Sequence, residues 1–178
     1  MRLNVRRGKT LLVDGPASVT LLSGSARVWG AVIEPPFKIV VRNGRRLPFE
    51  AASDSEFELM LGETSSFLEM EGSSIPESWT DCVNLLLASK QRLWVLVMGA
   101  VDTGKTSLCT YLANQALEEG RKVAIIDGDL GQSDIGPPST VGSARIIGPI
   151  VELYGIQPQS LAFVGTTTPS KDVSACLN

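Results

Sequence analysis

Glycine, lysine and threonine stand in one short segment at a spacing that suits phosphate binding. Residues 99–106 read Gly-Ala-Val-Asp-Thr-Gly-Lys-Thr and match the pattern G-x-x-x-x-G-K-[ST]. Glycines let backbone N–H groups approach phosphate oxygens, and a helix that begins at the end of the loop adds partial positive charge. We therefore predict a nucleotide-binding loop in which Lys105 reaches the β- and γ-phosphates and the Thr106 hydroxyl ligates Mg²⁺. The residues expected to line the nucleotide are Gly99, Ala100, Val101, Asp102, Thr103, Gly104, Lys105, Thr106 and Ser107.

Two aspartates follow the next apolar stretch of the chain. Residues 127–132 read Asp-Gly-Asp-Leu-Gly-Gln. Carboxylates at the C-terminal end of a strand beside a phosphate loop lie where substrates bind in open α/β sheets. One carboxylate can hold Mg²⁺ or its water, and the other can accept a proton from an attacking hydroxyl. The alternative is a pair of turn residues, because Asp and Gly both favour turns.

A third group of polar side chains, Thr166-Thr167-Thr168, is followed by Pro169 and Ser170. Small hydroxyls at this place can contact a phosphate or the backbone of a substrate. Equally, Ser170 can cap a helix that we expect to begin near Lys171. Both interpretations stay open.

Composition excludes several classes of chemistry. The sequence contains no histidine, which rules out Ser-His-Asp and Cys-His catalysis and His-containing zinc sites within this chain. Its cysteines, Cys82, Cys109 and Cys176, form no CxxC pair, and we expect buried, reduced thiols. No apolar run reaches the ~18 residues needed to span a bilayer, and the start lacks the apolar stretch of a signal peptide. We expect an intracellular protein with no membrane partner, cytoplasmic or, in a eukaryote, nuclear.

Charge is unevenly distributed along a chain of net charge −3. Residues 1–50 carry nine Lys or Arg against three Asp or Glu, and residues 51–90 carry one Lys against eight acids. Arg42, Arg45 and Arg46 cluster around Asn43-Gly44. The basic start could face a phosphate backbone. The alternative is two oppositely charged parts of one solvated surface.

The 178 residues change pattern near residue 73. Before it, short β-type runs alternate with glycines, which predicts a small all-β, sandwich-like domain over residues 1–73. Asn43-Gly44 predicts a type I′ hairpin turn. The expected strands are Lys9–Asp14, Ser18–Leu22, Ala26–Ile33, Phe37–Arg42, Arg46–Ala51, Phe57–Leu61 and Ser66–Glu71.

Residues 74–178 alternate helical and buried-strand patterns. This order predicts an α/β domain of the P-loop NTPase type with a parallel sheet. Such domains usually have five or more strands, and the three expected here suggest a piece of a longer protein. The expected elements are helices Glu77–Ser89 and Lys105–Glu119, with Gly120 as C-cap, and strands Leu93–Met98, Val123–Ile126 and Leu161–Val164.

The tandem of motifs resembles the polynucleotide 5′-hydroxyl kinases. This family includes the RNA 5′-kinase of the pre-mRNA cleavage machinery and the nucleolar kinase of ribosomal RNA processing. The resemblance is carried by G-x-x-D-x-G-K-[ST], by D-x-D-x-G-Q about two dozen residues later, by a proline-containing loop and by Phe163–Pro169. A β-domain ahead of the P-loop domain also fits. The resemblance implies ATP and Mg²⁺ as cofactors, a 5′-OH end of RNA or DNA as substrate, and RNA-processing proteins as partners.

The resemblance also implies roles for single residues. Asp129 is implied as the base that takes the proton of the 5′-hydroxyl, with Lys105 as the second catalytic residue. Asp127 and Gln132 are implied to support the metal or its waters. The loop with Thr167 and Thr168 is implied to clamp the substrate, and an arginine-bearing lid is expected beyond Asn178.

Two other functions stay open. One is a scaffold in an RNA-processing complex that binds ATP without turnover, although Lys105, Thr106 and Asp129 are all present. The other is a P-loop switch ATPase or GTPase, in which an Asp also follows the phosphate loop. The tandem of motifs and the absence of an N-K-x-D motif disfavour the switch.

Overall fold

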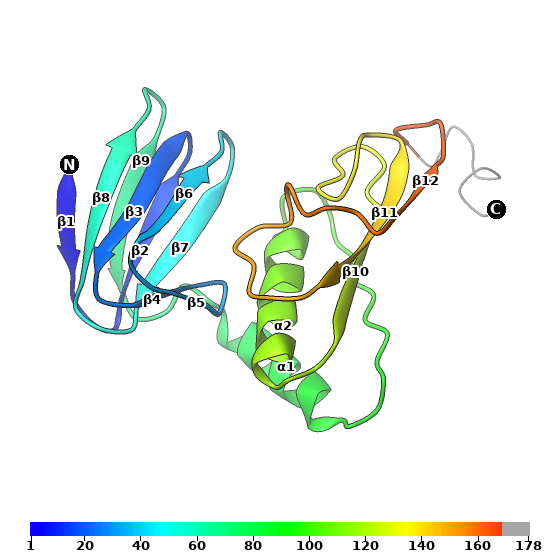
Figure 1. Cartoon of the computed structure of the whole chain (residues 1–178), viewed down its shortest axis with the longest axis horizontal. Coiled ribbons are helices and arrows are strands. Elements are labelled where there is room, and N and C mark those ends of the chain that lie inside the picture. Colours follow the sequence, from blue (N-terminus) through cyan, green and yellow to red (C-terminus); the bar gives the residue numbers. More distant parts are fainter. Residues whose placement is uncertain (169–178) are drawn as a thin grey trace. The chain divides into compact units, whose positions relative to one another are not determined.

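The computed structural model describes residues 1–168, and the chain divides into two compact units, Met1–Leu93 and Trp94–Asn178 (Figure 1). The division falls later than the boundary predicted after residue 73, because helix α1 (Glu77–Ala88) groups with the first unit. Trp79 of α1 lies against Trp29, with 6.2 Å between the ring centroids. The helix expected from Lys171, together with Pro169, Ser170 and Cys176, lies outside the described residues.

The first unit is built from two antiparallel sheets (Figure 1). The four-stranded sheet has the order β1-β8-β3-β6, and the five-stranded sheet has the order β5-β4-β7-β2-β9. The strands are β1 (Arg2–Val5), β2 (Lys9–Asp14), β3 (Ala17–Ser23), β4 (Ala26–Val28), β5 (Ala31–Ile33), β6 (Phe37–Val41), β7 (Arg46–Ala51), β8 (Ser55–Leu61) and β9 (Ser66–Glu71).

Alternating side chains place the core of the first unit between the sheets. In β3, Ala17, Val19 and Leu21 are buried, and the residues between them are half-buried. This alternation is that of a strand with one face turned to the core. Phe49 of β7 and Phe57 of β8 belong to different sheets, and their rings meet edge to face at 5.8 Å. Both phenylalanines are fully buried, so this contact joins the two sheets.

The turn at Asn43-Gly44 differs from its prediction. It does not close a hairpin, because β6 and β7 belong to different sheets. The Arg45 N–H donates to the Arg42 carbonyl at 3.0 Å, and Gly44 has a φ of 73°. A type I′ turn needs a positive φ at both central residues, and only Gly44 has one. The segment therefore carries the chain from one sheet to the other.

A hairpin with two positive φ angles occurs elsewhere, inside the single strand expected over Ala26–Ile33. Trp29 has a φ of 47° and Gly30 a φ of 78°, and they join β4 to β5 with Val28 opposite Ala31. A tryptophan with positive φ is uncommon. Its ring contacts Trp79 of α1, a tertiary contact that local sequence does not reveal.

The second unit holds helix α2 (Lys105–Glu118) and strands β10 (Val123–Asp127), β11 (Thr140–Ile146) and β12 (Ser160–Phe163). The C-cap of α2 is Glu119, one residue before the predicted Gly120, and Gly120 follows it with a left-handed φ of 73°. The Gly120 N–H donates to the Leu117 carbonyl and the Arg121 N–H to the Ala116 carbonyl, each at 2.9 Å. These bonds satisfy carbonyls that the end of the helix would otherwise leave unpaired.

The parallel sheet predicted for this unit is not formed among the described residues. Strand β11, which the sequence did not predict, lies between β10 and β12 and runs antiparallel to both. Leu93–Met98, expected as a buried strand, is not a strand here, and Trp94 is 83% and Leu96 80% exposed. A strand needs a neighbour to bond its backbone, and β10, β11 and β12 pair only with one another in the part described.

A small apolar core holds the second unit together. Ile135, Ala144, Ile146 and Leu153 are buried in one cluster, against which Leu117 of α2 packs. Within the described residues, no helix is long and apolar enough to cross a membrane.

A matched pair of variants on β8 tests this account of the first unit. Phe57→Ala removes a fully buried ring between the sheets and is expected to lower the free energy of unfolding by about 3–5 kcal/mol. Met60→Ala, at a side chain 65% exposed on the same strand, is expected to change it by less than about 0.5 kcal/mol. Chemical denaturation followed by tryptophan fluorescence measures both, and equal effects would contradict the assigned core.

Candidate functional site

The predicted phosphate loop leads directly into α2. Gly104 is the N-cap of the helix, with a left-handed φ of 86°, and Lys105 and Thr106 begin its first turn. Asp102 also has a positive φ, of 60°. A Cβ added at Gly99 would lie 2.7 Å from the Thr103 hydroxyl, so the loop closes tightly over its own start. Glycines at 99 and 104 thus meet two separate steric demands, close approach and positive φ.

The lysine of the loop folds back over it. The Lys105 ammonium donates to the Ala100 carbonyl at 2.8 Å, and the Thr103 hydroxyl donates to the same carbonyl at 2.9 Å. A full positive charge therefore lies at the loop that the sequence predicts to hold phosphate.

The amino terminus of α2 suits an anion. No side chain caps it and no acidic residue stands in its first turn. A helix start of this kind leaves N–H groups without intrahelical partners and carries a partial positive charge. Phosphate oxygens would satisfy both, and the Thr106 hydroxyl is a donor type that Mg²⁺ accepts as a ligand. The residues present fit a nucleotide phosphate with Mg²⁺.

Asp127, the last residue of β10, accepts several hydrogen bonds from the loop after it. Its Oδ1 accepts from the Asp129 N–H at 3.0 Å. Its Oδ2 accepts from the Ser133 hydroxyl at 3.2 Å, the Asp134 N–H at 2.7 Å and the Ile135 N–H at 3.1 Å. The turn interpretation and the substrate-site interpretation of Asp127 and Asp129 are therefore compatible, because one carboxylate shapes the loop that carries the other.

Asp129 is exposed on this loop. Its Oδ1 accepts from the Gly131 N–H at 3.1 Å and the Gln132 N–H at 3.0 Å. Its Oδ2 accepts no hydrogen bond from residues 1–168 and is open to a proton or a cation. Gln132, also exposed, thus helps to hold Asp129 through its backbone.

The threonine segment after β12 lies beside this loop. A Cβ placed on Gly131 would come within 3.3 Å of the Thr167 carbonyl. Thr166 uses its hydroxyl locally, donating to the Thr168 carbonyl at 3.0 Å and accepting from the Thr168 N–H at 3.3 Å. The fold therefore brings the second and third sequence motifs together.

Helix α2 links the phosphate loop to the acidic strand end. It packs against β10. Burial, and secondarily the nearby negative charge of Asp127, raises the pKa of the Cys109 thiol on α2 above its ordinary value. Among the described residues, no hydrogen bond or ion pair joins Lys105 to Asp129. The two predicted catalytic residues are therefore connected only through the packing of α2 against β10.

The two described cysteines differ in exposure. Cys109 is half-buried, but Cys82 is exposed, against the expectation of buried thiols.

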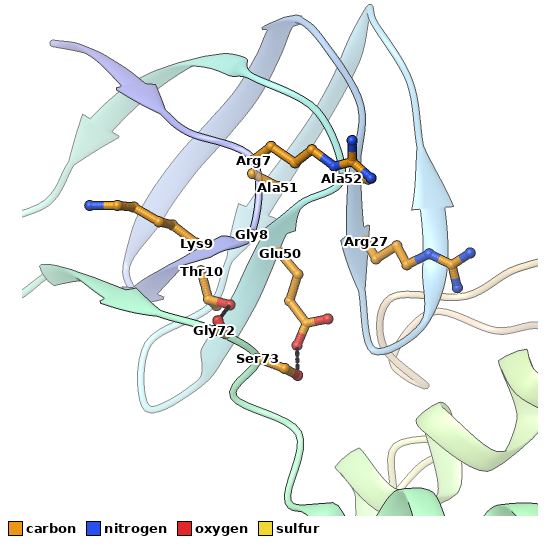
Figure 2. Close-up of a pocket in the computed structure, with 10 residues that line it drawn as sticks. All are labelled: Arg7, Gly8, Lys9, Thr10, Arg27, Glu50, Ala51, Ala52, Gly72 and Ser73. Atoms are coloured by element: carbon orange, nitrogen blue, oxygen red, sulfur yellow. Dashed lines mark hydrogen bonds between the residues drawn. The ribbon is translucent and has the colours of Figure 1, made fainter.

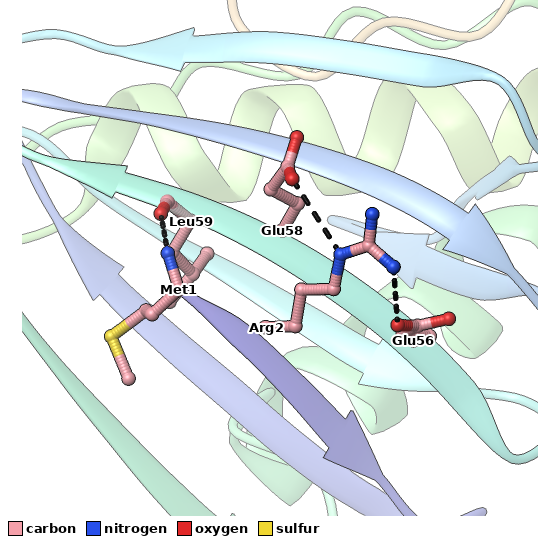
Figure 3. A network of polar contacts seen from close by, with 5 residues as sticks. All are labelled: Met1, Arg2, Glu56, Glu58 and Leu59. Carbon is pink, nitrogen blue, oxygen red and sulfur yellow. Dashed lines mark hydrogen bonds and ion pairs between the residues drawn. The ribbon is translucent and has the colours of Figure 1, made fainter.

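Several charges in the first unit are paired with each other. Arg2 lies between Glu56 and Glu58, at 3.5 and 3.7 Å, beside the bond from the Met1 ammonium to the Leu59 carbonyl (Figure 3). Lys9 contacts Glu69 and Glu71 at 2.8 and 2.9 Å. The basic start and the acidic segment after it therefore behave as two parts of one solvated surface.

The arginine cluster at the Asn43-Gly44 turn is also partly neutralised. Arg46 makes a bidentate contact with Asp14, at 2.7 and 2.9 Å. These hydrogen bonds from Arg46 hold the pKa of the Asp14 carboxyl below its usual value, against the opposing effect of burial. This pairing lessens the case for a phosphate-binding turn.

A hollow of about 350 Å³ in the first unit is lined by Arg7, Thr10, Arg27, Glu50 and Ser73, among others (Figure 2). Several of its polar groups are already engaged, because Ser73 donates to Glu50 at 2.5 Å and Thr10 donates to the Gly72 carbonyl at 2.6 Å. Lys9, at its rim, is bound by Glu69 and Glu71. It holds none of the residues predicted to do chemistry.

Sequence reasoning missed three residues that support the site. Ser133 donates to Asp127. Asn114, buried in α2, donates to the Ile150 carbonyl at 2.7 Å and accepts from the Ile150 N–H at 2.9 Å. Gly142 of β11 allows the Ile135 carbonyl to approach, because a Cβ there would lie 1.8 Å from that oxygen. Of these three, only Asn114 could have been found from local sequence, because it is an amide side chain on the core-facing side of a helix.

Comparison with known proteins agrees with this arrangement. Residues 99–178 match the family described as mRNA cleavage and polyadenylation factor CLP1 P-loop. The polyribonucleotide 5′-hydroxyl-kinase of Methanocaldococcus jannaschii is 41% identical over 97 residues, 54% of this chain and 27% of the relative. The enzyme of the same name from Pyrococcus furiosus is 40% identical over 97 residues, again 54% and 27%. The resemblance to the polynucleotide 5′-hydroxyl kinases is confirmed for this part of the chain.

Solved structures are similar in fold. A structure of Clp1p with Pcf11p has a TM-score of 0.63 at 17% identity and covers 82% of this chain and 36% of that one. The wild-type Clp1p–Pcf11p complex has a TM-score of 0.60 with the same coverage. The chain thus spans about a quarter of the length of the first curated relatives and about a third of these structures.

Lys105→Ala is expected to weaken binding of ATP with Mg²⁺ by roughly 10- to 100-fold, because it removes a charged donor from the phosphate loop. Lys122→Ala, which removes an exposed lysine just before β10, is the matched control and should bind as the unmodified chain does. Isothermal titration calorimetry measures all three. Equal affinities for the two variants would reject the assignment of the loop.

Proposed function

We propose that the protein transfers the γ-phosphoryl group of ATP to the 5′-hydroxyl end of a polynucleotide, RNA in preference to DNA, as part of RNA processing. The observation that carries the proposal is the loop of Asp127–Gln132, which presents the exposed carboxylate of Asp129 at the end of a strand packed on the phosphate-loop helix. The names of the curated relatives supply the substrate class.

The residues of the chain divide the work of this reaction. Backbone N–H groups at the start of α2 and the Lys105 ammonium bind and orient the ATP phosphates. The Thr106 hydroxyl would hold Mg²⁺, which would neutralise charge on the phosphate oxygens. Gln132, Thr167 and Thr168 lie on the loops around Asp129 and are proposed to contact the substrate.

Asp129 is the proposed general base. As the 5′-oxygen bonds to the γ-phosphorus, the bond from that phosphorus to the β,γ-bridging oxygen breaks and ADP leaves. The proton of the hydroxyl passes to Asp129, whose Oδ2 is open among the described residues. The hydrogen bonds from Gly131 and Gln132 hold the other oxygen in place.

Partner, location and the completed sheet belong to the same proposal. Protein partners in RNA processing are supported by the similar solved structures, in which Clp1p is bound to Pcf11p. A cytoplasmic location, nuclear in a eukaryote, follows from that role. A parallel P-loop sheet that includes Leu93–Met98 is supported by the exposure of these apolar residues, since burying them against further strands would stabilise the fold at ~25 cal/mol per Å².

Asp129→Asn in the whole protein is expected to keep ATP binding and to lose ~10²–10⁴-fold in the rate of phosphorylation, because an amide cannot accept the proton. Transfer of label from γ-labelled ATP to a 5′-OH oligonucleotide gives the rate, and calorimetry gives the affinity. A near-normal rate would remove Asp129 from the mechanism.

Binding of the oligonucleotide through its phosphates should weaken steeply with salt, with a log–log slope of about −0.7 for each phosphate contacted on a single strand. Matched 5′-OH RNA and DNA oligonucleotides, each titrated at two salt concentrations, test this, and RNA is expected to be labelled faster. If neither is labelled while ATP is bound or hydrolysed, a scaffold or a switch replaces the kinase.

A further inference from the structure

We propose that Asp127 is a positioning residue, which fixes the loop that carries Asp129 and does not itself ligate Mg²⁺. Its effect on catalysis rests on the proposed kinase function, whereas its effect on the loop stands on hydrogen bonds alone. The two aspartates of the D-x-D pair would then have different roles: Asp129 would act on the substrate, and Asp127 would hold the loop.

The Asp127 carboxylate accepts four hydrogen bonds from within the chain, three of them on Oδ2. A carboxylate offers about four lone-pair sites on its two oxygens. Four donors bond to it here: the Asp129 N–H reaches Oδ1, and the Ser133 hydroxyl and the N–H groups of Asp134 and Ile135 all reach Oδ2. Ligation of a cation through Oδ2 would displace at least one of its three donors, and a cation on Oδ1 would share that oxygen with the Asp129 N–H. Backbone N–H groups deprived of such a partner away from water carry a free-energy cost.

The loop has a second anchor at its far end. Ile135 is fully buried in the core of the second unit, and two of its neighbours there, Ala144 and Ile146, belong to β11. Its carbonyl lies so close to Gly142 that a Cβ there would come within 1.8 Å. The loop from Asp127 to Ile135 is therefore fixed at both ends. The Asp127 carboxylate holds its start, and the packing of Ile135 on β11 holds its end.

The hydrogen bonds of the loop fix the orientation of the Asp129 side chain. Its N–H is held by Asp127, and its Oδ1 is held by the N–H groups of Gly131 and Gln132. Its Oδ2 accepts nothing from the part of the chain that the structure describes. Asp127 thus fixes the backbone from which a single free carboxylate oxygen is presented.

The isosteric variants Asp127→Asn and Asp129→Asn separate the two roles. In Asp127→Asn an amide –NH₂ faces N–H donors, and the loop loses acceptor sites. In Asp129→Asn the remaining carbonyl oxygen still accepts from Gly131 and Gln132. Hydrogen exchange of a peptide over residues 128–135, followed by mass spectrometry, is expected to quicken at least about tenfold in Asp127→Asn and to change little in Asp129→Asn. Unchanged exchange in Asp127→Asn overturns the proposal, whether or not the protein proves to be a kinase.

Kinetics of the whole protein give the second readout. Asp127→Asn is expected to lower kcat by about 10- to 100-fold, with KM for ATP and the Mg²⁺ concentration at half-maximal rate within about twofold of the unmodified protein. A raised Mg²⁺ requirement, with kcat recovered at saturating Mg²⁺, would make Asp127 a metal ligand and overturn the proposal.

A second variant keeps the test decisive if Asp127→Asn fails to fold. Ser133→Ala deletes only the 3.2 Å bond to Oδ2. It should quicken exchange of the same peptide to a smaller extent and lower kcat without altering the Mg²⁺ requirement. Normal exchange together with normal kcat in Ser133→Ala would overturn the positioning role.

Discussion

Backbone N–H groups in a loop that faces a ligand have no helix or strand partner, and the second unit depends on how this constraint is met. In the loop after β10, the carboxylates of Asp127 and Asp129 accept the donors from within the chain. At the start of α2, no side chain does so. In the loop after β10, these N–H donors therefore have partners within the chain. At the start of α2, the N–H donors are left for an anion to accept.

The same principle of internal pairing explains why charge counts were a poor guide to a nucleic-acid surface. Residues 1–50 are strongly basic and residues 51–90 strongly acidic, but neighbouring strands bring the two segments side by side. Arg2 meets Glu56 and Glu58 because β1 pairs with β8, and Lys9 meets Glu69 and Glu71 because β2 pairs with β9. Any recognition of a polynucleotide is then better sought at the loops of the second unit.

Local sequence predicted the elements whose pattern is local. Strands β2, β7 and β9 match their predicted bounds, and Gly120 has the positive φ typical of a glycine at a helix end, because such patterns are set by neighbouring residues. Leu93–Met98 and β11 do not match, because whether a segment forms a strand depends on pairing with strands that are distant in the sequence. β11 includes Gly142 and Ser143, which weaken its strand pattern. The phosphate loop was predictable from spacing alone, whereas the contacts of Ser133 and Gly142 depend on the folded path of the loop.

A D-x-D pair illustrates where sequence patterns stop being informative about roles. The two aspartates are the same residue type two positions apart, so residue type cannot tell their roles apart. Their surroundings can: Asp127 ends a strand and is enclosed by donors from Ser133, Asp134 and Ile135, whereas Asp129 lies exposed with one oxygen held. When environment assigns roles to identical groups, the carboxylate with a whole oxygen left unbonded among the described residues is the better placed to meet a substrate, and the carboxylate bonded on both oxygens is the better placed to hold the loop.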